Sequence, residues 1–235
     1  MKIGIYGGAF NPIHYGHLRT AEEVFEMLAL DKILFMPSGR TPFDKPELER
    51  AEHRYEMVSR AIKGNRHFEV SDIEVRRRGR SYTVDTIKKL KDKYRDSGLY
   101  FILGIDAFLD LPGWKQPDVL VRLAGLIVIS RPGYAFRDLA SSPYLDGVSP
   151  RIFNALDNGK INERSFRLSE EQNVYLCNVT GLNISASRIR SLVTSGKKIS
   201  YLLPDSVKSY IISNKLYKNC HQYRPGTRKG EFLHN

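Results

Sequence analysis

Two kinds of apolar pattern alternate along the chain. Short apolar runs are typical of buried strands, and between them lie longer segments in which apolar residues recur at helical spacing. This alternation predicts parallel strands joined by crossover helices. The predicted strands are 2–6, 32–36, 68–70 with a neighbour at 73–77, 100–103, 126–130 and 174–177. The predicted helices are 16–28, 48–62, 83–94, 117–124, 185–194 and 204–214.

The order of these segments predicts an α/β fold: a doubly wound, open parallel sheet of the Rossmann-like kind with a helical C-terminal part. Ligands of such sheets bind at the carboxyl ends of the strands, where the strand order reverses. We expect a single domain over 1–217. The polar stretch 134–173 is expected to be an insertion, either with small helices such as 149–156 or as a flexible loop. Residues 218–235 form a basic tail that we expect to be mobile.

Composition narrows the class of protein. No apolar run in the 235 residues approaches the ~20 needed to cross a membrane, and the start of the chain lacks the layout of a signal peptide. Two cysteines far apart give no disulfide framework. We therefore expect a cytoplasmic protein that does not bind a membrane.

The formal net charge of +11 raises the alternative of a nucleic-acid partner. That alternative is disfavoured because the chain carries no RNA- or DNA-binding motif. An enzyme with anionic substrates also benefits from positive potential. The sequence leaves the oligomeric state open, with a homo-oligomer as one alternative.

The most informative segment is Gly7–His17, GGAFNPIHYGH, between the first predicted strand and the first predicted helix. Its two leading glycines allow a sharp turn and a close approach of backbone to a ligand. A helix beginning near Gly16 would offer free N–H groups and a positive dipole end to an anion. His14 and His17 fall on one side of that helix start and can reach the same phosphate.

Zinc is the competing interpretation of the paired histidines, because imidazoles are frequent metal ligands. Cys177 and Cys220 make no close pair, and no other histidine or acidic residue lies at ligand spacing from His14 or His17. Phosphate binding is therefore preferred, and no residue is predicted to bind a metal.

The segment Gly7–His17 resembles the signature of the HxGH nucleotidyltransferases, and in detail that of the bacterial nicotinate-nucleotide adenylyltransferases. Further blocks follow in the order of that family, and together they cover about 1–133 and 174–217. These blocks are Phe35–Pro37, Ser81–Thr86, Gly104–Asp106, Trp114, Arg131–Gly133 and Ile184–Arg190.

The resemblance implies adenylyl transfer from ATP to nicotinate mononucleotide, giving deamido-NAD and pyrophosphate in NAD biosynthesis. It implies His14 and His17 as the catalytic residues. ATP-binding residues are then expected at Gly8, Ala9, Phe10, Gly16, Gly104, Asp106, Ser185, Ser187 and Arg190. Mononucleotide-binding residues are expected at Asn11, Lys45, Tyr82, Thr83, Trp114 and Arg131. Mg²⁺ is the expected cofactor, held mainly by the ATP phosphates.

The chemistry of the two histidines suits this reaction. A phosphate oxygen attacks the α-phosphorus in line while pyrophosphate leaves, so catalysis is largely positioning and electrostatics. Imidazoles can donate hydrogen bonds to the phosphate oxygens, and we expect them to protonate readily near neutral pH. Ser185 is a predicted N-cap of a second helix whose N–H groups point at phosphate.

Other interpretations stay open for single motifs. Ser185 could cap an ordinary helix, Asp106 could cap a short helix instead of binding ribose, and Trp114 could fill the core instead of stacking on the pyridine ring. The sequence also departs from the family, with Ala9 in place of a hydroxyl residue. In the loop Thr41–Lys45, only Lys45 carries over from the family pattern.

Rival functions differ in the acceptor or in class. Other HxGH transferases act on nicotinamide mononucleotide, pantetheine phosphate or cytidylyl acceptors. Class I aminoacyl-tRNA synthetases share a similar turn, but the chain has no matching second loop or anticodon domain. A nucleotide- or RNA-binding module that retains the fold is the non-enzyme alternative.

Overall fold

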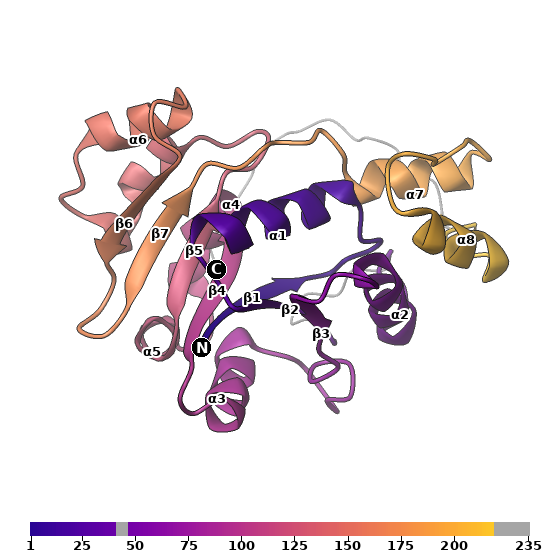
Figure 1. The fold of residues 1–235 in the computed structure, drawn as a ribbon, viewed down its shortest axis with the longest axis horizontal. Coiled ribbons are helices and arrows are strands. Elements are labelled where there is room, and N and C mark those ends of the chain that lie inside the picture. Colours follow the sequence, from indigo (N-terminus) through magenta and orange to yellow (C-terminus); the bar gives the residue numbers. More distant parts are fainter. Residues whose placement is uncertain (41–46, 219–235) are drawn as a thin grey trace, which may run out of the picture.

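A seven-stranded sheet runs through the middle of the molecule, with helices on both of its faces (Figure 1). The structure is a computed structural model and describes residues 1–40 and 47–218. The strand order is β3-β2-β1-β4-β5-β7-β6, and every neighbouring pair is parallel except β6 with β7. The strands are β1 Lys2–Gly8, β2 Lys32–Pro37, β3 Phe68–Val70, β4 Gly98–Gly104, β5 Gly125–Ile129, β6 Glu163–Arg167 and β7 Asn173–Cys177.

Helices cover both faces because successive side chains of each strand point to opposite sides. Ile3 and Ile5 of β1 face one core, whereas Tyr6 faces the other. On the Ile3 side lie α3 (Thr83–Lys93), α4 (Ile105–Leu109), α5 (Pro117–Leu123) and α6 (Pro150–Asp157). On the Tyr6 side lie α1 (Tyr15–Met27), α2 (Ala51–Ile62), α7 (Ala186–Thr194) and α8 (Asp205–Ser213). Among the described residues no helix is long and apolar enough to cross a bilayer.

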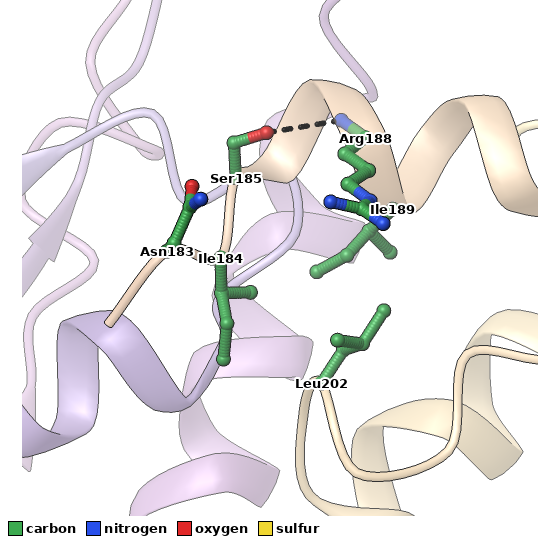
Figure 2. A pocket seen from close by; sticks show the side chains of 6 residues that line it. All are labelled: Asn183, Ile184, Ser185, Arg188, Ile189 and Leu202. Carbon is green, nitrogen blue, oxygen red and sulfur yellow. Dashed lines mark hydrogen bonds between the residues drawn. The ribbon is translucent and has the colours of Figure 1, made fainter. Parts of the chain in front are cut away.

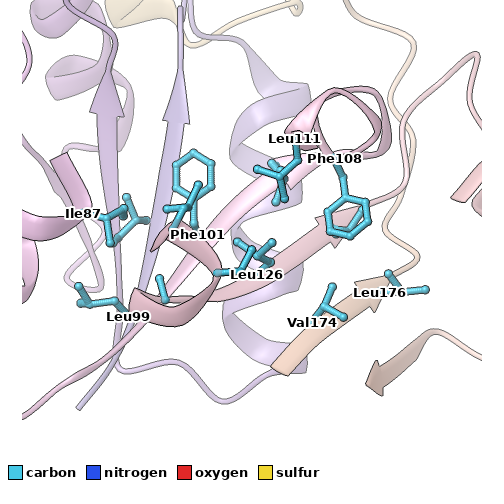
Figure 3. Packing of buried hydrophobic residues seen from close by; sticks show 14 of the residues in the cluster. Ile87, Leu99, Phe101, Phe108, Leu111, Leu126, Val174 and Leu176 are labelled. Atoms are coloured by element: carbon cyan, nitrogen blue, oxygen red, sulfur yellow. The ribbon is translucent and has the colours of Figure 1, made fainter. Parts of the chain in front are cut away.

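The core on the Ile3 side shows how this packing stabilises the sheet (Figure 3). Ile87 of α3 and Phe108 of α4 are fully buried against strand residues such as Phe101, Leu126 and Leu176. Burying one such side chain stabilises the fold by about 1.5–3 kcal/mol. The alternation of apolar strand segments with amphipathic helix segments therefore accounts for the helices on both faces of the sheet.

The strand order reverses between β1 and β4, which are adjacent and parallel. From β1 the chain continues to β2 and β3 on one side, and from β4 it continues to β5 on the other. In open α/β sheets, ligands bind in the crevice beyond the carboxyl ends of strands at such a point. The doubly wound Rossmann-like fold expected from the sequence is confirmed. A fold of this kind is expected to bind its ligand beyond Gly8 and Gly104, and that region is called the crevice below.

The stretch 134–173 contains ordered elements. It forms the short 3₁₀ helices η2 (Phe136–Ser141) and η3 (Pro143–Leu145), then α6 and the antiparallel edge strand β6. Its buried apolar residues join the core on the Ile3 side, and they are Phe136, Leu139, Leu145, Phe153 and Leu156. The helix expected at 149–156 is present as α6. That this stretch is an insertion stays a prediction.

Two sequence expectations about local structure are wrong. Residues 73–77, predicted as a strand, form a turn in which Arg76 N donates to Asp72 O. The cause is Glu74, which is buried and accepts hydrogen bonds from Gly39 N (3.3 Å) and the Thr86 hydroxyl (2.8 Å). A regular strand would not hold this carboxylate at both partners.

Helix α2 begins at Ala51, not at 48 as predicted. The preceding segment is held elsewhere, because Glu49 N donates to Asn11 Oδ1 at 3.1 Å. Of the expected basic tail, only Lys218 is described, and 219–235 lie outside the described residues.

Candidate active site

The segment after β1 turns at Phe10 and not at the leading glycines. Gly7 and Gly8 are the last residues of β1, whereas Phe10 has a φ of 46° in the left-handed region. Its ring is buried in the core on the Tyr6 side. The turn leads through the cis Asn11–Pro12 bond to His14, which is the N-cap residue of α1.

The two histidine rings lie against each other at the start of α1. Their centroids are 3.8 Å apart with planes inclined by 29°. The backbone N–H of His14 donates to Nδ1 of His17 at 3.3 Å. A neutral His17 ring therefore carries its proton on Nε2, where it is available as a donor.

Gly16 permits this arrangement. A Cβ atom at Gly16 would lie 3.0 Å from both Nδ1 and Cε1 of the His14 ring. That separation is tighter than ordinary van der Waals contact, so a side chain at this position would displace the imidazole.

Burial lowers the pKa of both imidazoles and so favours their neutral forms near pH 7. It lowers the pKa of His14 to about 4, helped by the positive charge of Arg131. It lowers the pKa of His17 well below its usual value, with His14 and Arg131 adding to the effect. The expectation that these rings protonate readily near neutral pH is therefore wrong for the free protein. The reason is desolvation, which penalises a buried cation.

His14 Nδ1 is a buried polar atom with no hydrogen-bond partner within 1–40 and 47–218. Buried polar groups normally have a partner, so such an atom requires an explanation. The same holds for Oδ1 of Asp106. Both atoms belong to residues expected to contact substrate.

The second predicted phosphate-binding block forms the start of α7. Ser185 is its N-cap, as expected, and the Ser185 hydroxyl accepts a hydrogen bond from Arg188 N at 3.2 Å. Ser187 Oγ lies 3.4 Å from Ser185 Oγ. A cavity of about 250 Å³ opens beside this helix start (Figure 2). It is lined by Asn183, Ile184, Ser185, Arg188, Ile189 and Leu202.

The starts of α1 and α7 are neighbours in space. Arg190 Nη1 of α7 donates to the carbonyl oxygen of Asn11 at 2.9 Å. Tyr15 N of α1 donates to the carbonyl of Leu202, which lines the cavity beside α7 (3.1 Å). A Cβ at Gly16 would come within 3.8 Å of the Ile184 carbonyl. The starts of α1 and α7, each with the positive end of its helix dipole, therefore lie close together.

The ends of β4 and β5 add a charged pair to the crevice. Arg131 Nη1 donates to Asp106 Oδ2 at 2.6 Å. Asp106 lies in the first turn of α4 but makes no capping hydrogen bond there among the described residues. A Cβ at Gly104 would lie 2.5 Å from Asp106 Oδ1, so the close approach of this carboxylate requires glycine.

Three of the residues expected to bind the mononucleotide, Tyr82, Thr83 and Trp114, lie on the opposite face of the sheet from the histidines. Tyr82 precedes α3 and Thr83 is its first residue. Trp114 follows η1 (Leu111–Gly113), is partly buried, and meets Phe101 of β4 edge to face at 6.2 Å. Phe101 in turn lies against Gly7 at the end of β1. The crevice thus separates a histidine side from a tryptophan side.

Asn11 and Lys45, the two residues expected to contact the mononucleotide phosphate, differ from the residues above. The side chain of Asn11 is buried and engaged with protein, since Nδ2 donates to Glu47 O at 2.9 Å. Lys45 lies outside the described residues. Phosphate contacts from either residue stay predictions.

No group of three or more histidine, cysteine or acidic side chains suited to a metal ion occurs in the part of the chain that the structure describes. A divalent cation that accompanies ATP would therefore need the triphosphate for most of its ligands.

Sequence reasoning missed Arg54 of α2, whose side chain is 1% exposed. Its guanidinium donates to Ala9 O (2.8 Å), Ser38 O (2.6 Å) and Glu49 O (2.8 Å). It thereby joins the ends of β1 and β2 to the segment before α2. The signal in the sequence was an arginine in register with the buried stripe of α2, which includes Met57 and Val58.

Sequence comparison finds relatives that align with most of this chain. Residues 5–192 match the model of the cytidylyltransferase-like family. A protein of Desulfitobacterium hafniense (strain Y51), named "Probable nicotinate-nucleotide adenylyltransferase", is 41% identical over 92% of this chain and 96% of its own length. A protein of Pelobacter propionicus with the same name is 39% identical over 94% of this chain and all of its own length.

Solved structures share the fold. The Plasmodium falciparum nicotinic acid mononucleotide adenylyltransferase complexed with APC aligns with a TM-score of 0.66 at 22% identity, covering 92% of this chain and 96% of that one. The same enzyme complexed with NaAD aligns with a TM-score of 0.66 at 23% identity, covering 92% and 97%. At these identities the likeness supports the architecture.

Proposed function

The chain belongs to the cytidylyltransferase-like family and, within it, to the nicotinate-nucleotide adenylyltransferases, and we propose that it performs their reaction. It transfers the adenylyl group of ATP to nicotinate mononucleotide, yielding deamido-NAD and pyrophosphate, a step of NAD biosynthesis. One observation carries the proposal beyond family membership. The starts of α1 and α7 lie close together. His14, between the end of β1 and the first residue of α1, has an Nδ1 atom that is buried and without a partner among the described residues.

The reaction forms one bond and breaks one. A phosphate oxygen of the mononucleotide attacks the α-phosphorus of ATP, and the bond from that phosphorus to the β-phosphate bridging oxygen breaks as pyrophosphate leaves. Negative charge spreads over the phosphoryl oxygens in the transition state. No protein nucleophile is required, so the protein contributes position and preorganised hydrogen-bond donors.

We assign the donor function to His14 and His17. Nε2–H of the neutral His17 ring and the positive dipole end at the start of α1 are suited to the α- and β-phosphate oxygens. Because both pKa values are lowered by burial, the unliganded rings act as neutral donors. A bound triphosphate would favour the protonated form of either ring by adding negative charge.

The remaining ATP contacts follow the two helix starts. Ser185, Ser187 and the N–H groups of α7 bind phosphate, with the backbone of Gly8, Ala9, Phe10 and Gly16 completing the surface. Asp106 accepts hydrogen bonds from the ribose hydroxyls. Its Oδ1 atom is suited to this because it is buried and has no partner within 1–40 and 47–218. Arg190, which holds Asn11 O, supports this surface and is only 16% exposed at its side chain.

The mononucleotide binds on the tryptophan side of the crevice. Backbone N–H groups at Tyr82 and Thr83 receive the pyridine carboxylate, and Trp114 stacks on the ring. Arg131, at the end of β5, adds positive charge between the two sides. Lys45 and Asn11 are the predicted contacts for the mononucleotide phosphate. Mg²⁺ bound together with ATP would neutralise phosphate charge, with the triphosphate supplying most of its ligands.

The assay is pyrophosphate release from ATP with nicotinate mononucleotide, in the absence of RNA. We expect turnover with this acceptor and a kcat/KM at least tenfold lower with nicotinamide mononucleotide. No release with either acceptor would overturn the proposed function, and a tenfold preference for the amide would overturn the acceptor. Cytoplasmic location and a homo-oligomer stay predictions, the first supported by the buried free thiol of Cys177.

A further inference from the structure

Beyond the groups that face substrate, we propose that Tyr217 is a positioning residue for adenylyl transfer. Its hydroxyl fixes Asn11, and through Asn11 the turn that delivers His14 and His17. The inference rests on the proposed function for the reaction it names. This role means that the C-terminal helical part contributes to the active site, in addition to packing against the sheet.

The contact itself is a buried hydrogen bond. The Tyr217 hydroxyl donates to Asn11 Oδ1 at 3.1 Å across 206 positions of sequence. Tyr217 is 4% exposed. Its hydroxyl also lies 3.9 Å from Met57 Sδ, but a thioether sulfur is a weak acceptor, so the amide oxygen is the stronger partner.

The backbone adopts an uncommon conformation to place this hydroxyl. Tyr217 has a φ of 62°, in the left-handed region that costs a residue with a side chain free energy. The carbonyl of Tyr217 accepts a hydrogen bond from the Thr194 hydroxyl at 2.9 Å, which ties the residue to the end of α7. Packing alone would be satisfied by phenylalanine, since the hydroxyl adds nothing to apolar burial.

Asn11 is the junction on which these restraints meet. Besides Tyr217, its Oδ1 accepts from Glu49 N (3.1 Å), and its Nδ2 donates to Glu47 O (2.9 Å). Its carbonyl accepts from Arg190 Nη1 (2.9 Å). Segments before α2, in α7 and after α8 therefore converge on one residue. The backbone runs from this residue through Pro12 and Ile13 directly to His14.

A loosened junction would affect the chemical step more than stability. The imidazoles must meet phosphoryl oxygens within narrow limits, and a displacement of about 1 Å can cost up to about a hundredfold in rate. Asn11 keeps its bonds to the Glu47 and Glu49 backbone and to Arg190 when the phenol hydroxyl is removed. The fold should therefore persist while the histidine turn becomes less restrained.

The test replaces one hydroxyl at a time. Wild-type turnover is measured first by pyrophosphate release, so that a failure of the proposed function is seen on its own. We expect Tyr217→Phe to lower kcat about tenfold, to change both KM values less than threefold, and to leave the urea midpoint nearly unchanged. The matched control is Tyr210→Phe. Tyr210 lies on α8, and its hydroxyl is hydrogen-bonded to His53 Nδ1 on α2 at 2.8 Å. The kcat of this variant should stay within twofold of wild type.

Two further measurements separate positioning from general weakening. In an Asn11→Ala background, adding Tyr217→Phe should cause less than a twofold further loss, because the hydroxyl acts through Asn11. The ring resonances of His14 and His17 in NMR spectra should shift in Tyr217→Phe and not in Tyr210→Phe. A Tyr217→Phe enzyme within twofold of wild-type kcat, or an undiminished tenfold loss in the Asn11→Ala background, would overturn the proposal. Unshifted histidine resonances would overturn it even if the protein transferred no adenylyl group.

Discussion

Arg190 and Asn11 lie 179 positions apart, yet the guanidinium of one donates to the carbonyl of the other at 2.9 Å. This bond joins helix α7 to the turn before α1, and so brings together the two segments that the sequence marks for phosphate binding. This neighbourhood is what the proposed binding of a triphosphate between the two helix N-termini requires. The following changes test how the individual parts contribute.

Removing the His17 ring should abolish most of the activity. We expect His17→Ala to lower kcat at least about a hundredfold, because losing one preorganised donor to a developing charge costs ~2.7–4 kcal/mol. Far-ultraviolet circular dichroism should remain that of the wild type. His67→Ala removes a histidine ring that packs on Phe25, away from the crevice, and serves as the control. A His17→Ala enzyme with near-normal kcat would remove the catalytic assignment.

The close approach at Gly16 gives a second prediction. Gly16→Ala places a methyl group 3.0 Å from the His14 ring and should rotate the imidazole away. We expect kcat to fall at least about tenfold with little loss of stability. Gly181→Ala is the matched control, since a Cβ there meets only Pro132 Cγ at 3.8 Å. Equal kcat values for the two variants would contradict the geometry of the site.

Stability should depend on pH through His14. Its pKa is about 4 in the folded protein and 6.5 ordinarily, so the unfolded chain takes up the proton first as the pH falls. The free energy of unfolding therefore decreases from about pH 6.5 to pH 4, by about 2 kcal/mol at pH 5 from this group. Above pH 6.5 the group contributes nothing. Urea unfolding at pH 7.5 and 5 should show a smaller decrease for His14→Gln than for wild type; identical decreases would count against the buried neutral ring.

Arg54 should be among the costliest side chains to remove. Arg54→Met removes a buried guanidinium that donates to the partly buried carbonyls of Ala9, Ser38 and Glu49. We expect a loss of about 3–5 kcal/mol in the free energy of unfolding. Arg50→Met removes an exposed arginine paired with Glu52 and should cost less than about 1 kcal/mol. Chemical denaturation of both variants shows whether the hydrogen bonds of Arg54 stabilise the fold; equal losses for Arg54→Met and Arg50→Met would mean that they do not.

Trp114 should matter for one substrate only. If its ring stacks on the pyridine, Trp114→Ala should raise the KM for nicotinate mononucleotide about tenfold or more and leave the KM for ATP within about twofold. Trp114→Phe should recover part of the loss. A uniform change in both KM values would favour the alternative in which Trp114 only fills the core beside Phe101.

Several features of the site were accessible from sequence because their signals are local. The Ser185 cap, the α1 start at the paired histidines and the parallel strands with crossover helices all follow from short-range patterns. The turn at 73–77 was predicted wrongly because Val75 and its neighbours look like a strand, while the buried partners of Glu74 lie in distant segments. The position of the sharp bend at Phe10 was also missed, since glycines usually make such turns.

By itself the sequence determined the α/β class, the doubly wound sheet and the starts of the two helices proposed to bind phosphate, because hydrophobic period, turn residues and caps act within a few positions. Only the tertiary structure decided which side chains support those starts and how the histidines titrate. Arg54, Arg190 and Tyr217 reach partners far away in sequence, and burial sets the protonation of His14 and His17. Such contacts and the loss of solvent exist only once the chain has folded.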